Sequence, residues 1–207
     1  MLQEINKELL INLNSLTKYD IIQTLVKIFS DYPIFFVPIF LVVLWIYYTY
    51  KKSTTIISNI HLTKNLLEKE KLLFIFYSIT IWIIINLVIQ HYIHIDRPEE
   101  ALKWVWNLIL NHIPDASFPS DHTTVSVAFL TSLFLAGYKK TWLYFAPFVI
   151  LMLFSRVIIW VHWPFDILVW IFIWILSSFI TFKYFTKIKI VNKLNQNIIK
   201  LMWYIKL

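Results

Sequence analysis

Three short polar stretches hold almost all of the unusual polar chemistry of this sequence. They are Arg97-Pro98, then Phe118-Pro119-Ser120-Asp121-His122, and then Ser155-Arg156 followed by His162 and Asp166. Arginines, histidines, a serine and an aspartate are the groups that bind a phosphate and break its ester or anhydride bond. The chain is 59% hydrophobic, and ionisable groups beside apolar segments of this kind usually have a functional reason to be there.

The second stretch precedes an apolar run that begins near Thr123, and Ser120 is a good N-cap for a helix at that point. The free backbone N–H groups and partial positive charge of such a helix start form an anion site. His122 lies in the first turn, where it can give a proton to a leaving oxygen. The alternative is that Ser120 and Asp121 only cap the helix and that His122 extends to the membrane interface.

The two arginines differ in how strongly their sequence surroundings indicate a function. Arg156 lies inside the apolar run 142–160, and a charge at the centre of a membrane helix costs about 2.5–3.5 kcal/mol on insertion scales. We therefore expect it to face a polar cavity, the alternative being that it extends to the interface from the end of the run. Arg97 lies just beyond another apolar run, and by itself it is an ordinary loop residue.

His162 and Asp166 are four residues apart, and Pro164 between them ends one helix and permits the next. In the first turn of that next helix, the Asp166 carboxylate would reach one imidazole nitrogen, fix the tautomer and leave the other nitrogen free to attack. The alternative is an interfacial histidine beside a capping aspartate. We predict no metal site, because a third ligand with suitable spacing is missing and two arginines would repel a cation.

Five apolar runs have about the length that a membrane helix needs, and they position the polar stretches. The runs are residues 32–50, 72–89, 123–138, 142–160 and 165–182. Residues 1–31 have apolar positions at helical spacing, which predicts an amphipathic interfacial helix, and residues 188–207 predict a second, basic one. The expected fold is an all-α polytopic membrane bundle of about five transmembrane helices, with residues 32–187 as its membrane domain.

Lysine and arginine counts predict the orientation of this bundle. Residues 51–71 hold five lysines and the segment from Lys183 onward holds six, whereas residues 90–121 hold one arginine and one lysine against five acids. The C-terminus is therefore expected inside and the N-terminus outside. All three polar stretches then fall on the outer side.

Composition excludes several other classes of protein. The chain has no cysteine and a single glycine, Gly137, so it has neither a thiol nucleophile nor a glycine-rich nucleotide loop. The net charge of +7 is distributed by loop and not gathered along a groove, so we predict no nucleic-acid partner. A soluble core of this size could not bury so much apolar surface.

In order and spacing, the three stretches resemble the type-2 phosphatidic acid phosphatase superfamily, whose signatures are Lys-x6-Arg-Pro, Pro-Ser-Gly-His and Ser-Arg-x5-His-x3-Asp. The third signature is complete, while the second has Asp121 in place of glycine and the first has Gln90 in place of lysine. The resemblance spans residues 90–166. Residues 115–124, Asp-Ala-Ser-Phe-Pro-Ser-Asp-His-Thr-Thr, are similar to the bacterial undecaprenyl-diphosphatases associated with bacitracin resistance.

The resemblance implies a mechanism without a cofactor. His162 would attack the terminal phosphorus to form a phosphohistidine, Asp166 would orient it, and His122 would protonate the leaving group and then activate water. The phosphate-binding residues would be Arg97, Arg156, Ser120, Asp121, Ser155 and Gln90. Because Gln90 donates hydrogen bonds but carries no charge, the arginines would hold more of the anion.

The implied function is hydrolysis of undecaprenyl diphosphate at the outer face of the bacterial plasma membrane, which recycles the lipid carrier for peptidoglycan and cell wall biogenesis. One alternative is the same chemistry on phosphatidylglycerophosphate, phosphatidate or a lipid A phosphate. A second is a non-catalytic membrane protein that binds lipid phosphates. The expected partners are a polyprenyl diphosphate and the bilayer, and the sequence does not indicate the oligomeric state.

Overall fold

The computed structural model describes residues 1–51, 58–93, 95–102 and 117–204, and within these ranges all regular structure is helical. This confirms the predicted all-α membrane bundle. The α-helices are α1 (Leu2–Asn14), α2 (Asp20–Asp31), α3 (Phe36–Tyr50), α4 (Ser58–Tyr92), α5 (Pro98–Ala101), α6 (Asp121–Leu135), α7 (Lys139–Ile158), α8 (Pro164–Phe185) and α9 (Lys189–Tyr204). Short 3₁₀ turns, Ser15–Lys18 and Tyr32–Phe35, join α1 to α2 and α2 to α3.

Four segments of the described chain are long and apolar enough to cross a membrane, which makes this a multi-pass membrane protein. They are Asp20–Tyr50, Lys64–Tyr92, Lys139–Ile158 and Pro164–Phe185. The expected span at 123–138 forms α6, but that helix has only 15 residues, about 22 Å at the usual rise and short of a full bilayer crossing. The predicted bundle of about five helices therefore corresponds to these four segments and the shorter α6.

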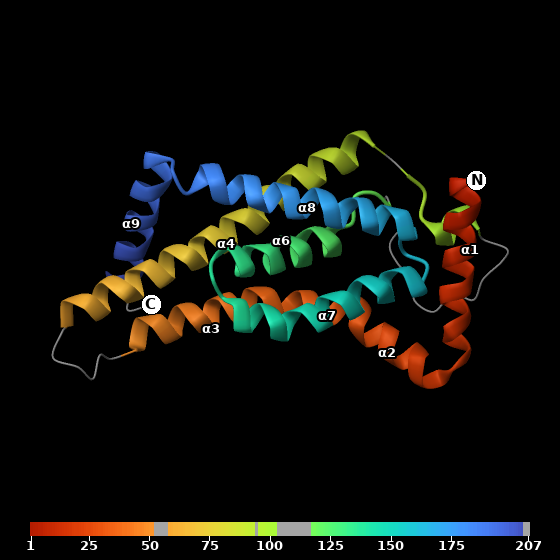
Figure 1. Cartoon of the computed structure of the whole chain (residues 1–207), viewed down its shortest axis with the longest axis horizontal. Helices are drawn as coiled ribbons and strands as arrows, with labels where there is room; N and C mark the ends of the chain where they lie inside the picture. The colour runs from red at the N-terminus through yellow and green to blue at the C-terminus, as the bar shows by residue number, and fades with distance from the viewer. Residues whose placement is uncertain (52–57, 94, 103–116, 205–207) are drawn as a thin grey trace.

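The short helix α6 lies at the centre of the bundle, where α4, α7 and α8 pack around it (Figure 1). Nine of its side chains are buried, including Ala128, Phe129 and Leu133, which are fully enclosed. Ala128 and Phe129 belong to a core with Ile75 of α4 and Val37 of α3, while Val127 belongs to a second core with Trp170 and Trp174 of α8. Burial on every side holds the first turn of α6 in one position.

Two helices cross opposite ends of the bundle, α1 at the end where α7 stops and α8 begins, and α9 at the other (Figure 1). Leu10 of α1 is fully buried in the same core as Trp170 and Trp174. The segment 1–31, expected as one interfacial helix, instead forms α1 and α2, and α2 belongs to the apolar span that continues into α3. The expected basic C-terminal helix corresponds to α9, which packs on α4.

Candidate functional site

The three polar stretches meet at one end of the bundle, where α4 and α7 end and α6 and α8 begin. Ser120 is the N-cap of α6, as predicted, and its hydroxyl accepts from the Thr123 N–H at 3.4 Å. The same hydroxyl lies 3.0 Å from Nε2 of His162. Ser120, which the local sequence predicts as a helix N-cap, therefore also contacts the central histidine of the site.

His162 is buried and has a defined tautomer. Its Nδ1 lies 2.7 Å from the Ser117 carbonyl oxygen, which can only accept, so Nδ1 carries the proton and Nε2 has a free lone pair. Burial, followed by the charges of Arg156 and Arg97, holds the pKa of this imidazole well below its ordinary value. A neutral ring with an unprotonated Nε2 has the electronic state of a nucleophile.

The turn before His162 has an unusual backbone that the rest of the chain holds in place. Trp160 adopts φ of 67°, a left-handed conformation that costs a residue with a side chain roughly 1–2 kcal/mol. Its carbonyl accepts from the Glu99 N–H at 3.3 Å, and the Val161 N–H donates to the Arg156 carbonyl at 3.1 Å. Trp163 is anchored through Nε1 to the Asp96 carbonyl at 3.1 Å. These bonds turn the chain so that His162 enters the bundle.

Asp166 differs from its expected role. Its Oδ2 accepts from the Ser117 hydroxyl at 3.0 Å, and it is the Ser117 carbonyl that receives the His162 Nδ1 proton. Ser117 therefore stands between the carboxylate and the imidazole, and the direct contact predicted from the four-residue spacing is replaced by a bridge. The spacing placed Asp166 in the first turn of α8, but the loop before α6 supplies the histidine's partner.

Two buried arginines converge on His162. One terminal nitrogen of Arg156 lies 3.5 Å from Nε2 of His162, so the guanidinium lies beside the imidazole. Arg97 is close enough for its charge to act on both His162 and Arg156. Within the described residues, Nε and Nη1 of Arg97 and Nε of Arg156 are buried without a hydrogen-bond partner. Buried donors of this kind are rare in proteins and match the oxygens of an anion.

His122 is partly exposed at the entrance of this cluster, and its Nε2 lies 3.5 Å from Oδ1 of Asp31. The same carboxylate oxygen lies 2.5 Å from Arg156 Nη1. Asp31, the last residue of α2, was missed by the sequence reasoning. Its place at the end of an amphipathic run was the only signal, and that signal is shared with many solvent-exposed aspartates.

Gln90 and Asp121, the two departures from the family signatures, contact each other. The Gln90 amide donates to Asp121 Oδ1 at 3.0 Å and to the Pro119 carbonyl at 2.8 Å. Asn86 of α4 also donates to Asp121 Oδ1. These bonds fasten the Pro119–His122 segment to α4. Each unusual residue explains the other, since a carboxylate at 121 needs donors and an amide at 90 supplies them.

Ser155, which was expected to bind phosphate, lies in α7 next to Arg156. Its hydroxyl donates to the Leu151 carbonyl within α7 at 2.7 Å, so its proton is used by the helix backbone. No group of three His, Asp or Glu side chains has the geometry of a metal site in the part of the chain that the structure describes. The residues brought together are His162, His122, Arg97, Arg156 and Ser120, with Asp31 added.

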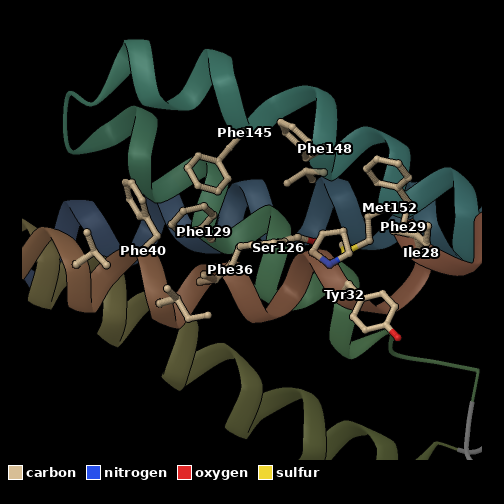
Figure 2. A pocket seen from close by; sticks show the side chains of 15 residues that line it. Ile28, Phe29, Tyr32, Phe36, Phe40, Ser126, Phe129, Phe145, Phe148 and Met152 are labelled. Carbon is tan, nitrogen blue, oxygen red and sulfur yellow. The ribbon is translucent and has the colours of Figure 1, made fainter. Parts of the chain in front are cut away.

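An apolar groove of about 530 Å³ begins one helical turn deeper in the bundle than the polar cluster. Ser126 lines it four residues after His122, Met152 lines it four residues before Arg156, and Tyr32 follows Asp31. In Figure 2, Tyr32 and Met152 lie toward one end, while Phe40, Phe129 and Phe145 lie toward the other. The groove therefore leads from the polar cluster into the apolar part of the bundle, between α3, α6 and α7.

Together, fold and site define a multi-pass α-helical membrane protein with a buried cluster of arginines around His162 that adjoins an apolar groove. The chain belongs to the PAP2 superfamily, whose family model matches residues 71–190, more than half of its length. It is similar to the undecaprenyl-diphosphatase BcrC of Bacillus subtilis (strain 168), with 32% identity over 91 residues. That match covers 42% of this chain and 45% of the relative, so it spans less than half of either protein. No solved structure matches significantly.

Proposed function

We propose that this protein is a membrane lipid phosphatase that hydrolyses undecaprenyl diphosphate to undecaprenyl phosphate and inorganic phosphate. The observation that carries the proposal is the buried cluster around His162. Arg97 and Arg156 keep donors without a hydrogen-bond partner, and a terminal nitrogen of Arg156 lies 3.5 Å from the unprotonated Nε2 of His162. Two fixed cations next to a neutral imidazole suit a phosphoryl group that must be neutralised while it is attacked. Membership of the PAP2 superfamily supports the same chemistry.

In the first step, Nε2 of His162 attacks the terminal phosphorus, and the bond between that phosphorus and the bridging oxygen breaks. His122 gives its proton to the bridging oxygen as the lipid monophosphate leaves, which yields a phosphohistidine and a neutral His122. Arg97, Arg156 and Ser120 bind the non-bridging oxygens, helped by the backbone N–H groups at the start of α6. The Ser117 carbonyl holds the Nδ1 proton and so balances the charge that develops on the ring.

In the second step, neutral His122 takes a proton from water as the water oxygen attacks the phosphohistidine. The bond between phosphorus and Nε2 breaks, inorganic phosphate leaves, and both histidines return to their starting states. His122 suits this alternating role because it is partly exposed at the entrance, whereas His162 is buried at the centre. The same residue acts as acid and then as base, as microscopic reversibility favours for such double displacements.

The choice of lipid rests on two supports. The apolar groove begins one helical turn from His122 and Arg156, so a substrate with its phosphate at His162 can place its hydrocarbon chain there. The relative with 32% identity is named as an undecaprenyl-diphosphatase. Both favour a polyprenyl diphosphate, while phosphatidylglycerophosphate, phosphatidate and lipid A phosphates are the competing substrates.

We further propose a location in the bacterial plasma membrane, with the active site on the extracytoplasmic side and the C-terminus in the cytoplasm. The support is the distribution of lysines, of which five lie within residues 51–71 and six at or after Lys183. The start of α4 and helix α9, which carry some of them, lie at the end of the bundle opposite the site (Figure 1). There the enzyme would recycle the lipid carrier for peptidoglycan synthesis. Because the undecaprenyl-diphosphatases that residues 115–124 resemble are associated with bacitracin resistance, the same activity here would give resistance to that antibiotic.

The test is phosphate release by the purified protein in detergent, with undecaprenyl diphosphate, phosphatidylglycerophosphate and phosphatidate compared in the presence of EDTA. Activity is expected in EDTA, because the arginines carry the charge that a metal would otherwise neutralise. His162→Ala is expected to abolish turnover, while His91→Ala, an exposed histidine near the end of α4, is the matched control. Undiminished activity in His162→Ala would refute the mechanism, and preference for a glycerolipid would refute the substrate.

A further inference from the structure

Asp31 joins the catalytic cluster from outside the segment that defines the family. The family model matches residues 71–190, whereas Asp31 is the last residue of α2 and lies 125 positions before its partner Arg156. Its Oδ1 lies 2.5 Å from Arg156 Nη1 and 3.5 Å from His122 Nε2. One carboxylate oxygen therefore contacts two side chains on two different helices, and both have roles in the mechanism proposed above.

The contacts of Arg156 explain what this carboxylate does. The guanidinium is planar, and its nitrogens point in fixed directions. When Nη1 donates to Asp31, Nη2 lies 3.5 Å from Nε2 of His162, so one edge of the guanidinium faces the carboxylate and another faces the nucleophile. Without Asp31, Arg156 would have no carboxylate within salt-bridge distance among the residues that the structure describes. Its rotamer would then no longer be determined.

The N-terminal helices are fastened to the same turn that carries His162. Val26 of α2 packs with Ile158, Ile159 and Val161. The Asn14 side chain donates to the Ile158 carbonyl at 2.8 Å, and Asn6 accepts from the Phe165 N–H at 3.1 Å. This packing holds the end of α2 at a fixed distance from Arg156, as a positioning role requires.

We propose that Asp31 is a positioning residue of the active site, which orients Arg156 and His122 toward a phosphate held at His162. The proposal rests on the proposed function for its kinetic consequences, because those two side chains are assigned their roles there. The competing explanation is that the carboxylate only fills the anion site of the empty protein and leaves when phosphate binds. The two explanations predict opposite effects when the charge is removed.

The experiment compares Asp31→Asn and Asp31→Glu with wild type, and with Asp20→Asn, an exposed aspartate at the other end of the same helix. For positioning, Asp31→Asn is expected to lower kcat on undecaprenyl diphosphate by about 10- to 100-fold, the usual effect of misplacing one charge-stabilising donor. KM should change by less than about threefold. Asp31→Glu should recover a substantial part of kcat, and Asp20→Asn should match wild type.

A second measurement needs no turnover. Orthovanadate, which can adopt the five-coordinate geometry of a phosphoryl-transfer transition state, is titrated into each purified variant in detergent, and its dissociation constant is determined by calorimetry. Positioning predicts that Asp31→Asn binds vanadate at least about tenfold more weakly, since Arg156 is no longer held in place. Equal or tighter binding, or a lower KM with unchanged kcat, would overturn the proposal and favour the carboxylate as an occupant of the anion site.

Folding is checked by the melting temperature in detergent. If Asp31→Asn does not fold, the same two measurements on Asp31→Ser decide, because that substitution also removes the carboxylate. Reduced kcat and weaker vanadate binding at an unchanged melting temperature support positioning, and wild-type values refute it. A wild-type protein that hydrolyses no lipid would refute the proposed function, and vanadate binding would then decide on Asp31.

Discussion

Replacing Ser117 with alanine tests the unexpected arrangement around the nucleophile. The Ser117 hydroxyl donates to Asp166 Oδ2 at 3.0 Å, while its backbone carbonyl accepts from His162 Nδ1 at 2.7 Å. The substitution removes the hydroxyl and keeps the carbonyl. If Asp166 acts only by holding Ser117 in place, then Ser117→Ala and Asp166→Asn interrupt the same bridge and should have similar effects.

The size of the effect follows from the bond that is lost. A hydrogen bond to a charged group contributes about 1.5–3 kcal/mol, and each 1.36 kcal/mol corresponds to a factor of ten in rate. If the whole contribution is expressed in the transition state, each single variant loses roughly 10- to 150-fold in kcat. The double variant should lose little more than either one, because side chains in one network do not contribute additively.

The assay is single-turnover phosphate release from undecaprenyl diphosphate in detergent, with melting temperatures measured alongside. Ser155→Ala is the matched control, since that hydroxyl donates within α7, and its rate should stay within about twofold of wild type. A direct contact between Asp166 and His162 predicts a different outcome, a loss of about 10⁴-fold in Asp166→Asn, as for a wrong tautomer, with Ser117→Ala nearly unaffected. That pattern would refute the bridge.

Three further results are expected. Val43→Trp, in the lining of the apolar groove, should raise KM for undecaprenyl diphosphate about tenfold, the equivalent of two lost methylene contacts. KM for the shorter farnesyl diphosphate should not change. The control is Val42→Trp, at an equally exposed position, which should leave KM for both lipids unchanged. Burial, followed by the charges of Arg156 and Arg97, lowers the pKa of His162 in the folded protein. An unfolded histidine has a pKa of about 6.5, so near and below pH 6.5 the unfolded state binds more protons than the folded state. The melting temperature should therefore fall between pH 7.5 and pH 5.5, and should fall less in His162→Asn; an equal fall in both would contradict the burial of a neutral ring. Gln90→Leu removes one of the hydrogen-bond donors to Asp121 and should lower the melting temperature by a few degrees. Gln90→Lys should keep kcat/KM within about threefold of wild type, because its ammonium can pair with Asp121 and not with the substrate.

Features that depend on neighbours in the chain could be predicted from the sequence. Ser120 caps a helix through an N–H three residues later, and Pro164 begins the next helix, so local rules place both. The length and apolarity of the runs likewise predicted an all-α membrane bundle. Membership of the PAP2 superfamily was predicted from the order of three signatures, because signature spacing survives even where residues such as Gln90 and Asp121 depart from the pattern.

The partners of these residues were decided only by tertiary structure. Four-residue spacing predicted that Asp166 would touch His162, but Ser117, from another segment, fills that place. Gln90 was expected to be an uncharged phosphate ligand. In the structure, the packing of α4 against α6 brings its side-chain amide to Asp121. Asp31 has only a local signal that many solvent-exposed aspartates share, because its role depends on how α2 packs against α7. The sequence determines the chemistry of each side chain. Its partner depends on which distant segments of the chain pack together in the tertiary structure.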